Sequence, residues 1–147
     1  MENEHITIRT ANWPQEQELL RQLRNTVFVQ EQNVPVDIEW DGYDQEATHF
    51  IAFDHNGDAI ATARLLPSGK LGRMAVLRNW RDHGIGSQVL RYVLRWSKSN
   101  FEKIHLHAQV QAIPFYQRAG FQPYGERFYE AGIEHQAMDI NLHLLDD

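Results

Sequence analysis

The chain has 147 residues, which is the usual length of one compact domain. It contains no cysteine, and this excludes disulfide bridges, thiolate metal sites and a cysteine nucleophile. Twenty acidic residues against fourteen basic ones give a formal net charge of −6, which argues against a protein that binds nucleic acid through its phosphates.

The first half of the chain predicts a short strand, a helix and a set of three strands. Ile6 and Ile8 alternate with polar residues as in a strand, and a helix that begins at Trp13 carries its leucines on one face. The stretch 36–46 is rich in Asp and Glu and predicts an exposed acidic connection. Three strands separated by turns follow it, at 49–53, 59–66 and 71–77. They predict an antiparallel meander.

The second half predicts two helices and two strands. Apolar residues recur at helical spacing over 84–100, with arginine and lysine on the opposite side. A strand over 103–109, a short helix over 112–119 and a final strand over 138–144 follow. This order of elements predicts an α+β fold with one mixed sheet, formed by residues 1–147 as a single domain.

No segment indicates a membrane protein or an exported one. The apolar runs are far shorter than the ~20 residues that span a bilayer. The N-terminus lacks the basic and then apolar pattern of a signal peptide. We therefore expect a cytoplasmic protein without membrane or nucleic-acid partners.

The segment 81–86 lies between a predicted strand and the long amphipathic helix. Backbone amides at a helix start, near Gly84 and Gly86, can point at one anion, and Arg81 can add a positive charge, so this loop suits a pyrophosphate. The alternative is a plain turn whose glycines serve only the backbone conformation. Val89 stands where a dinucleotide fingerprint requires its third glycine, and no P-loop Gly-Lys-Ser/Thr is present.

A second motif follows this loop about 25 residues later. Ala112, Tyr116, Gly120 and Phe121 stand in an A-x-x-x-Y-x-x-x-G-F pattern. With the strand, R-x-x-G-x-G loop and helix start over 74–87, this motif resembles the GNAT superfamily of acetyl-CoA-dependent N-acetyltransferases. Further stretches are similar to its ElaA/YjcF-type bacterial subgroup, at 27–32, 39–49, 61–65 and 105–109.

The resemblance implies a mixed central sheet with splayed middle strands and an acetyl-CoA site between them. In the family the pantetheine arm pairs with the strand, and the pyrophosphate lies on the amides of the loop. The implied cofactor-binding residues are Met74, Ala75, Val76, Arg81, Asp82, His83, Gly84, Ile85, Gly86, Ser87, Gln109, Phe115 and Tyr116. Two of them depart from the family pattern, since Asp82 stands where many members have glycine and Gln109 where many have asparagine.

Acetyl transfer to an amine requires a neutral amine, a stabilised oxyanion and a proton for the leaving thiolate. The resemblance implies that Tyr116 lies beside the thioester sulfur. A phenol with an ordinary pKa of about 10 can donate a hydrogen bond or a proton to a thiolate there. The alternative is a buried aromatic residue with its hydroxyl satisfied. A backbone N–H near residues 74–76 is the expected oxyanion donor.

The general base is the least constrained assignment. On the strand 103–109, His105 and His107 point to the same side, so both can border one cleft. His107 is the expected base because histidine titrates near neutral pH, and Glu31 is a second expected catalytic residue. The histidines equally suit a polar sheet surface. Two rivals remain, Glu39 and His49, and water can carry the proton away without any base.

The histidine pair and the acidic stretch each allow a second interpretation. The His105-x-His107 pair lacks a third ligand at local spacing, so no metal is expected. The acidic stretch 37–46 is either a solvated loop or a wall that attracts a cationic amine, and we favour the second slightly.

The sequence therefore predicts an acetyl-CoA-dependent N-acetyltransferase that acts by direct attack on a primary amine of a small molecule or peptide, as a monomer or homodimer. One alternative uses a longer acyl donor or an acyl carrier protein, because residues 24–44 also resemble the start of acyl-homoserine-lactone synthases. Another is a CoA-sensing module without turnover.

Overall fold

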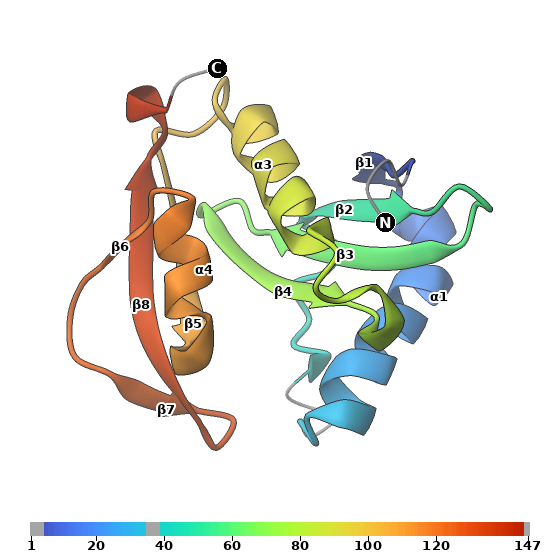
Figure 1. Ribbon diagram of the computed structural model, residues 1–147, viewed down its shortest axis with the longest axis horizontal. Coiled ribbons are helices and arrows are strands. Elements are labelled where there is room, and N and C mark those ends of the chain that lie inside the picture. Colours follow the sequence, from blue (N-terminus) through green and yellow to red (C-terminus); the bar gives the residue numbers. More distant parts are fainter. Residues whose placement is uncertain (1–4, 35–38, 146–147) are drawn as a thin grey trace.

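One mixed sheet organises the molecule. The computed structural model describes residues 5–34 and 39–145. Their eight strands form a sheet in the order β1-β2-β3-β4-β5-β8-β6, with β7 paired to β8, and helices lie against it (Figure 1). The α+β class and the mixed sheet are thus confirmed. Among these residues no helix is long and apolar enough to cross a membrane.

The first four strands pair antiparallel in chain order; the last three of them are the meander that the sequence predicts, and β1 extends it. They are β1 (Thr7–Ala11), β2 (Thr48–Phe53), β3 (Ala59–Leu65) and β4 (Lys70–Val76). Strand β2 is buried on both faces: Phe50 packs in the main core, whereas its neighbour Ile51 packs in a second cluster around Trp13. Both faces of the meander therefore require a covering helix.

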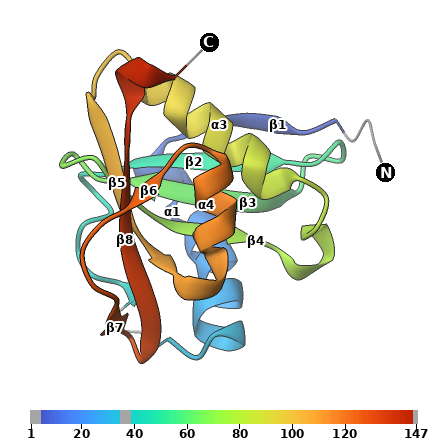
Figure 2. The same ribbon diagram turned by 60° about the vertical axis from the view of Figure 1, so that its left-hand side comes forward.

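The covering helices are α1 (Trp13–Arg24) and α3 (Ile85–Ser97), on opposite faces of β2, β3 and β4 (Figures 1 and 2). The side chain of Asn12 caps α1 by accepting the N–H of Gln15 at 3.4 Å. Helix α1 continues into η1 (Asn25–Glu31). The sequence pattern predicts this helical extension through Val27 and Phe28, but not its wider π-helical geometry. Such segments are frequent at functional sites.

Strand β4 is bulged and soon leaves its neighbour β5 (Lys103–Gln109). The bulge lies at Arg73, whose φ of 49° belongs to the left-handed region that most residues avoid. Parallel pairing with β5 is limited to Lys70 and Leu71. Beyond these residues the two strands diverge (Figure 1), which confirms the splayed arrangement.

The second half adds three more strands and a short helix. Strand β8 (Ile133–Asn141) pairs antiparallel with β5, and β6 (Gln122–Pro123) and β7 (Phe128–Glu130) pair with β8. The expected final strand at 138–144 was placed too late, because the first residues of β8 lack clear alternation and the chain turns after Asn141. The remaining helical segments are α4 (Ile113–Arg118) and the 3-10 turns η2 (Arg78–Trp80), η3 (Val110–Ala112) and η4 (Leu142–Leu144).

Candidate functional site

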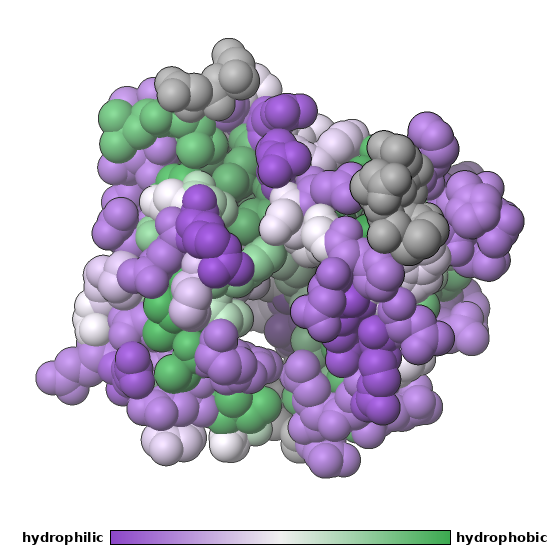
Figure 3. Space-filling view, in the orientation of Figure 1, coloured by the Kyte–Doolittle hydropathy of each residue, from purple (hydrophilic) through white to green (hydrophobic). Residues whose placement is uncertain are grey.

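A cavity of about 460 Å³ opens where β4 and β5 separate. Its walls come from η1, the segment after residue 38, β3, β4, β5, α4 and the turn between β7 and β8. The surface is hollowed between these two halves of the molecule (Figure 3). Four of the residues expected from the sequence line it, namely Met74, His107, Gln109 and Tyr116.

Tyr116 reaches across the gap from α4 to β4. Its hydroxyl group donates a hydrogen bond to the sulfur of Met74 at 3.7 Å, and its ring packs edge-on against Phe115 and Phe121. Burial raises the pKa of Tyr116 to about 12. An ordinary thiol has a pKa of about 8.5, so this phenol is suited to donate a hydrogen bond to a thiolate rather than to surrender its proton.

The edge of β4 presents main-chain groups to the gap. The N–H of Leu77 donates to the carbonyl of Ile60 at 2.9 Å, so Leu77 faces β3. Because successive residues of a strand face opposite neighbours, Val76 directs its N–H and C=O toward β5. Its C=O accepts the Nε of Arg81 at 2.9 Å. The N–H of Val76 is therefore placed to bind an extended ligand or a developing oxyanion.

The loop before α3 exposes a series of amides. Asp82 (φ 66°) and Gly84 (φ 77°) both adopt the left-handed conformation, which glycine and aspartate tolerate better than most residues. In the described part of the chain, the backbone N–H groups of 82–87 make no hydrogen bond to other protein groups. A Cβ atom at Gly84 would meet nothing within 4 Å, so the approach is open. This helix start can therefore bind an anion.

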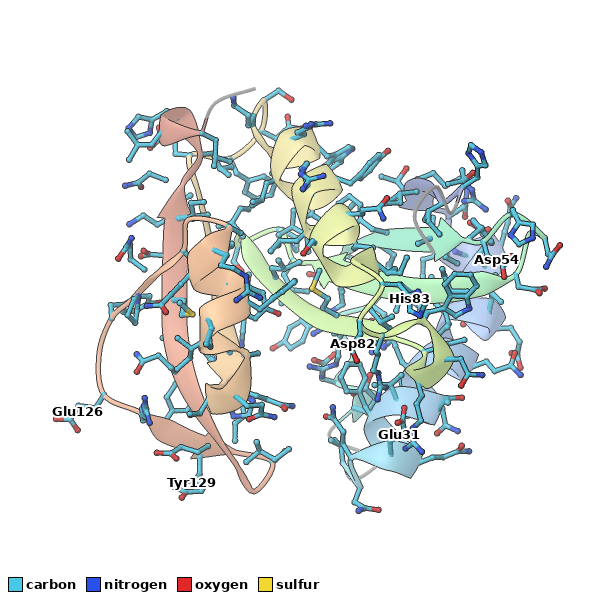
Figure 4. The ribbon with its side chains drawn as sticks, viewed as in Figure 1. Glu31, Asp54, Asp82, His83, Glu126 and Tyr129 are labelled. Atoms are coloured by element: carbon cyan, nitrogen blue, oxygen red, sulfur yellow. The ribbon has the colours of Figure 1, made fainter. Side chains whose placement is uncertain are left out.

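Glu31, which is labelled in Figure 4, lies outside this cavity. It forms an ion pair with Arg81. The Nη2 of Arg81 lies 2.7 Å from Oε1 of Glu31, and Arg78 bonds the same carboxylate at 2.8 Å. Hydrogen bonds from Arg81 and then Arg78 lower the pKa of Glu31. A carboxylate held by two arginines is a weak proton acceptor, and Arg81 offers less free charge to a phosphate than the sequence suggests.

A second groove of about 550 Å³ lies between α3 and α4, which run side by side (Figure 2). Leu90, Leu94 and Phe115 form an apolar floor, and Ser87 links the groove to the loop of exposed amides. Four cationic side chains also line it, from Arg91, Arg95, Lys98 and Arg118. The groove therefore suits a ligand with an apolar ring and an anionic group.

The acidic stretch is not the exposed connection that the sequence predicts, although Asp37 lies outside the described residues. Glu39 and Asp44 are buried, and Arg24 bonds their carboxylates at 2.7 and 2.8 Å. Asp41 accepts both terminal nitrogens of Arg64 at 2.9 Å. These three acids are thus paired with arginines, whereas Glu46 is exposed, so the acids that border the cavity offer little free charge to a cationic amine.

The two rival bases belong to this buried network. Burial raises the pKa of Glu39 although Arg73 and Arg24 oppose the shift. His49 stacks on Trp13 with ring centroids 4.6 Å apart, and burial lowers its pKa. Glu39 borders the cavity, whereas His49 lies outside its lining.

His107 lies on the opposite wall, in contact with a residue that the sequence did not single out. Its Nδ1 is 3.3 Å from each carboxylate oxygen of Glu130. Both side chains line the cavity, as does His135. Gln109 donates to the side chain of Gln32 at 3.1 Å, which ties β5 to the segment after η1. Within residues 5–34 and 39–145, no group of three His, Asp or Glu residues has metal-binding geometry.

The chain matches the family model described as the acetyltransferase (GNAT) domain over residues 14–142. It belongs to the GNAT acetyltransferase family. The resemblance found in the sequence is thereby confirmed. As a member of this family, the protein is an acyl-CoA-dependent acyltransferase.

GNAT proteins from several bacteria are similar to this chain. The Uncharacterized N-acetyltransferase YjcF of Bacillus subtilis (strain 168) is 33% identical over 120 residues, which cover 79% of this chain and 86% of YjcF. The crystal structure of Escherichia coli ElaA has a TM-score of 0.83 and 28% identity, covering 93% of this chain and 100% of ElaA. An acyl-CoA N-acyltransferase from Pseudomonas aeruginosa has a TM-score of 0.78 and 29% identity, covering 94% and 99%.

Three features of this GNAT structure were not predicted from the sequence. The first is the cationic groove: the basic face of α3 was recognised, but its spacing also fits a solvated helix face, and Arg118 comes from another helix. Glu130 had no signal, because β7 is only three residues long. The pairing of Glu31 with Arg78 and Arg81 joins residues about 50 apart in the chain.

Proposed function

We propose that this GNAT protein transfers an acetyl group from acetyl-CoA to a primary amine of a small molecule or peptide by direct attack. The observation that carries the proposal is the cavity between β4 and β5, bridged by the contact between Tyr116 and Met74. The exposed amides of 82–87 follow β4 after the short turn η2, and in the proposal they bind the diphosphate. The absence of cysteine removes the usual nucleophile for a covalent acyl intermediate.

The exposed edge of β4 and the loop after it offer groups for the pantetheine arm and the diphosphate of the donor. In the proposal, the pantetheine arm runs along Met74, Ala75 and Val76, and the main-chain N–H of Val76, which faces the gap, suits an extended chain. The diphosphate accepts hydrogen bonds from the amides of 82–87, in the segment Asp82, His83, Gly84, Ile85, Gly86 and Ser87. Arg81 orients the loop through its bonds to the carbonyl of Val76 and to Glu31.

The second groove offers a place for the adenosine end of the donor. Phe115 contributes to its floor, and a Cβ atom at Gly86 would lie only 3.4 Å from this ring, so the helix start packs directly against α4. In the proposal, the 3′-phosphate pairs with Arg91 and Arg118. Gln109 flanks the arm at the other end.

Each chemical requirement of the transfer is met by a group at the cavity. The N–H of Val76 stabilises the oxyanion, and the hydroxyl of Tyr116 donates a hydrogen bond to the departing thiolate. His107 removes the proton from the acceptor amine. The firm pairing of Glu31 with two arginines leaves it the role of holding the loop.

Calorimetry and a thiol-release assay test the proposal together. We expect acetyl-CoA and CoA to bind, and at least one amine of a panel to cause release of free CoA thiol. Binding of both nucleotides without release on any amine would favour a sensor, and release with longer acyl-CoA only would favour the longer donor. If neither nucleotide binds, the proposal fails.

The role of Tyr116 has its own matched test. Tyr116→Phe should lower kcat on the order of 10²-fold while the Kd for acetyl-CoA changes little, because only a transition-state interaction is removed. Tyr129→Phe is the control, since Tyr129 is exposed and points away from the molecule (Figure 4). Wild-type turnover in Tyr116→Phe would exclude the proposed contact with the thiolate.

A further inference from the structure

The contact between His107 and Glu130 joins two strands that border the cavity. His107 lies on β5, and Glu130 is the last residue of β7. Both oxygens of the carboxylate are 3.3 Å from Nδ1 of the imidazole. The ring of Phe128 packs edge-on against His107, with centroids 4.9 Å apart and an interplanar angle of 78°. The imidazole is thus held from one side by a carboxylate and from another by an aromatic ring.

This contact selects one form of the imidazole. A carboxylate only accepts hydrogen bonds, so the proton of a neutral His107 must be on Nδ1 when the bond to Glu130 forms. The other nitrogen, Nε2, is then an acceptor, and it has no hydrogen-bond partner within the described residues. Because the side chain lines the cavity, this basic nitrogen is available to a ligand there.

A strained turn holds Glu130 in place. Ala131 and Gly132 form a two-residue connection between β7 and β8, with φ of 54° and 76°. This is the backbone of a type I′ hairpin turn, in which Asn and Gly are the favoured residues. An alanine in the left-handed conformation costs roughly 1–2 kcal/mol. Such strain is concentrated at functional sites, and here it lies next to the carboxylate that bonds His107.

We propose that Glu130 is a positioning residue that holds His107 in the tautomer needed to remove a proton from the acceptor amine. The inference rests on the proposed function. In the step, Nε2 of His107 takes one proton from the alkylammonium group, and the freed lone pair attacks the thioester carbon. The C–N bond forms and the C–S bond breaks. CoA leaves as a thiolate that receives a hydrogen bond from Tyr116, and the second proton of the nitrogen passes to this thiolate or to water.

The charged groups around His107 support this assignment. Glu130 faces it from β7, His135 approaches the same carboxylate from β8 at 4.0 Å, and His105 precedes it on β5. Burial lowers the pKa of His105, as do the charges of Lys70 and His107. Among these groups Glu130 is therefore the anion that contacts His107, and its carboxylate lies at the Nδ1 side of the ring.

The test compares variants of Glu130 in the full-length chain. Glu130→Gln keeps a hydrogen-bond acceptor but removes the charge, whereas Glu130→Ala removes both. We expect kcat/KM for the amine to fall about 10-fold in Gln and up to about 100-fold in Ala, the range seen for groups that orient a functional histidine. The Kd for acetyl-CoA should stay unchanged.

The control is Glu126→Gln, since Glu126 lies on the connection that leads from β6 into β7 and points away from the molecule (Figure 4). Nitrogen-15 NMR of the histidine rings supplies a second readout, in which wild-type His107 should carry its proton on Nδ1 and Glu130→Ala should lose this preference. If the wild type is active and Glu130→Ala has the same kcat/KM and the same His107 tautomer, the inference is overturned and the proposed function is left intact. A wild type that binds acetyl-CoA but acts on no amine would defeat both.

Discussion

Replacing Asp41 with asparagine tests whether the ionised carboxylate of Asp41 stabilises the part of the cavity wall that the acidic stretch forms. Its carboxylate accepts two bonds from Arg64 and one from Arg73, each at 2.9 Å, and the N–H of Tyr43 at 3.1 Å. Burial alone would raise the pKa of Asp41, but these hydrogen bonds and the charges of the two arginines lower it from 3.8 to about 2. The folded protein therefore stabilises the ionised form.

The expected loss follows from this shift. A pKa lowered from 3.8 to about 2 corresponds to at most about 2.4 kcal/mol of stability at neutral pH. The side chain is 24% exposed, so screening by solvent reduces this to about 1–2 kcal/mol. A group with a lowered folded pKa contributes fully above its unfolded pKa and loses the contribution as the pH falls toward the folded pKa. The contribution at pH 3 should be about half of that at pH 7.

Urea unfolding of wild type and Asp41→Asn at pH 7, 5 and 3 measures this contribution. The difference in unfolding free energy between the two proteins has two parts. One part does not depend on pH, because the new amide group faces Arg64 in place of a carboxylate. The other part comes from the ionised carboxylate of Asp41 and shrinks as the pH falls. Glu39, whose pKa is raised by burial, is present in both proteins and largely cancels. Asp58→Asn is the control at an exposed turn. A difference that is the same at pH 3 and pH 7 would refute the view that ionised Asp41 holds this wall.

Three further substitutions have definite expected outcomes. Gly84→Asp should raise the Kd for CoA, measured by calorimetry, at least about 10-fold, because it places a negative charge beside the exposed amides. The control Gly57→Asp, at a similar φ of 85° in a distant turn, should leave this Kd unchanged. Arg118→Ala should reduce the preference for CoA over dephospho-CoA about 10-fold, and an unchanged ratio would remove the 3′-phosphate from the second groove. Ala131→Gly should raise the unfolding free energy by about 0.5–1 kcal/mol, as relief of strain exceeds the added chain entropy, and a decrease would show that the turn is unstrained.

Local periodicity was enough to predict most elements of the fold. The short, largely apolar runs of β2 and β3, which turn residues bound, and the amphipathic pattern of α3 depend on residues close in the chain. These elements lie within a few residues of their expected bounds. The splay between β4 and β5 came from the family resemblance, because no local pattern reports where two strands stop pairing. The bulge at Arg73 shows why, since a positive φ at an arginine has no sequence signal.

The site was predicted less completely because its charges pair over long distances. The sequence predicts an exposed acidic stretch, whereas Arg24 and Arg64 from two other elements pair with its buried acids. The sequence also predicts Glu31 as a catalytic residue, whereas the fold pairs it with Arg78 and Arg81. Residues with a strong motif, such as Tyr116, were placed at the cavity as expected. Partners without a motif, such as Glu130, required the structure.

Titration of uniformly nitrogen-15-labelled protein with CoA, followed through the backbone amides, tests most directly whether the loop before α3 binds the diphosphate. We predict that saturating CoA produces its largest amide shifts within 82–87, together with smaller ones at Val76. Saturable binding that leaves these amides unchanged, with the largest shifts elsewhere, would contradict the account.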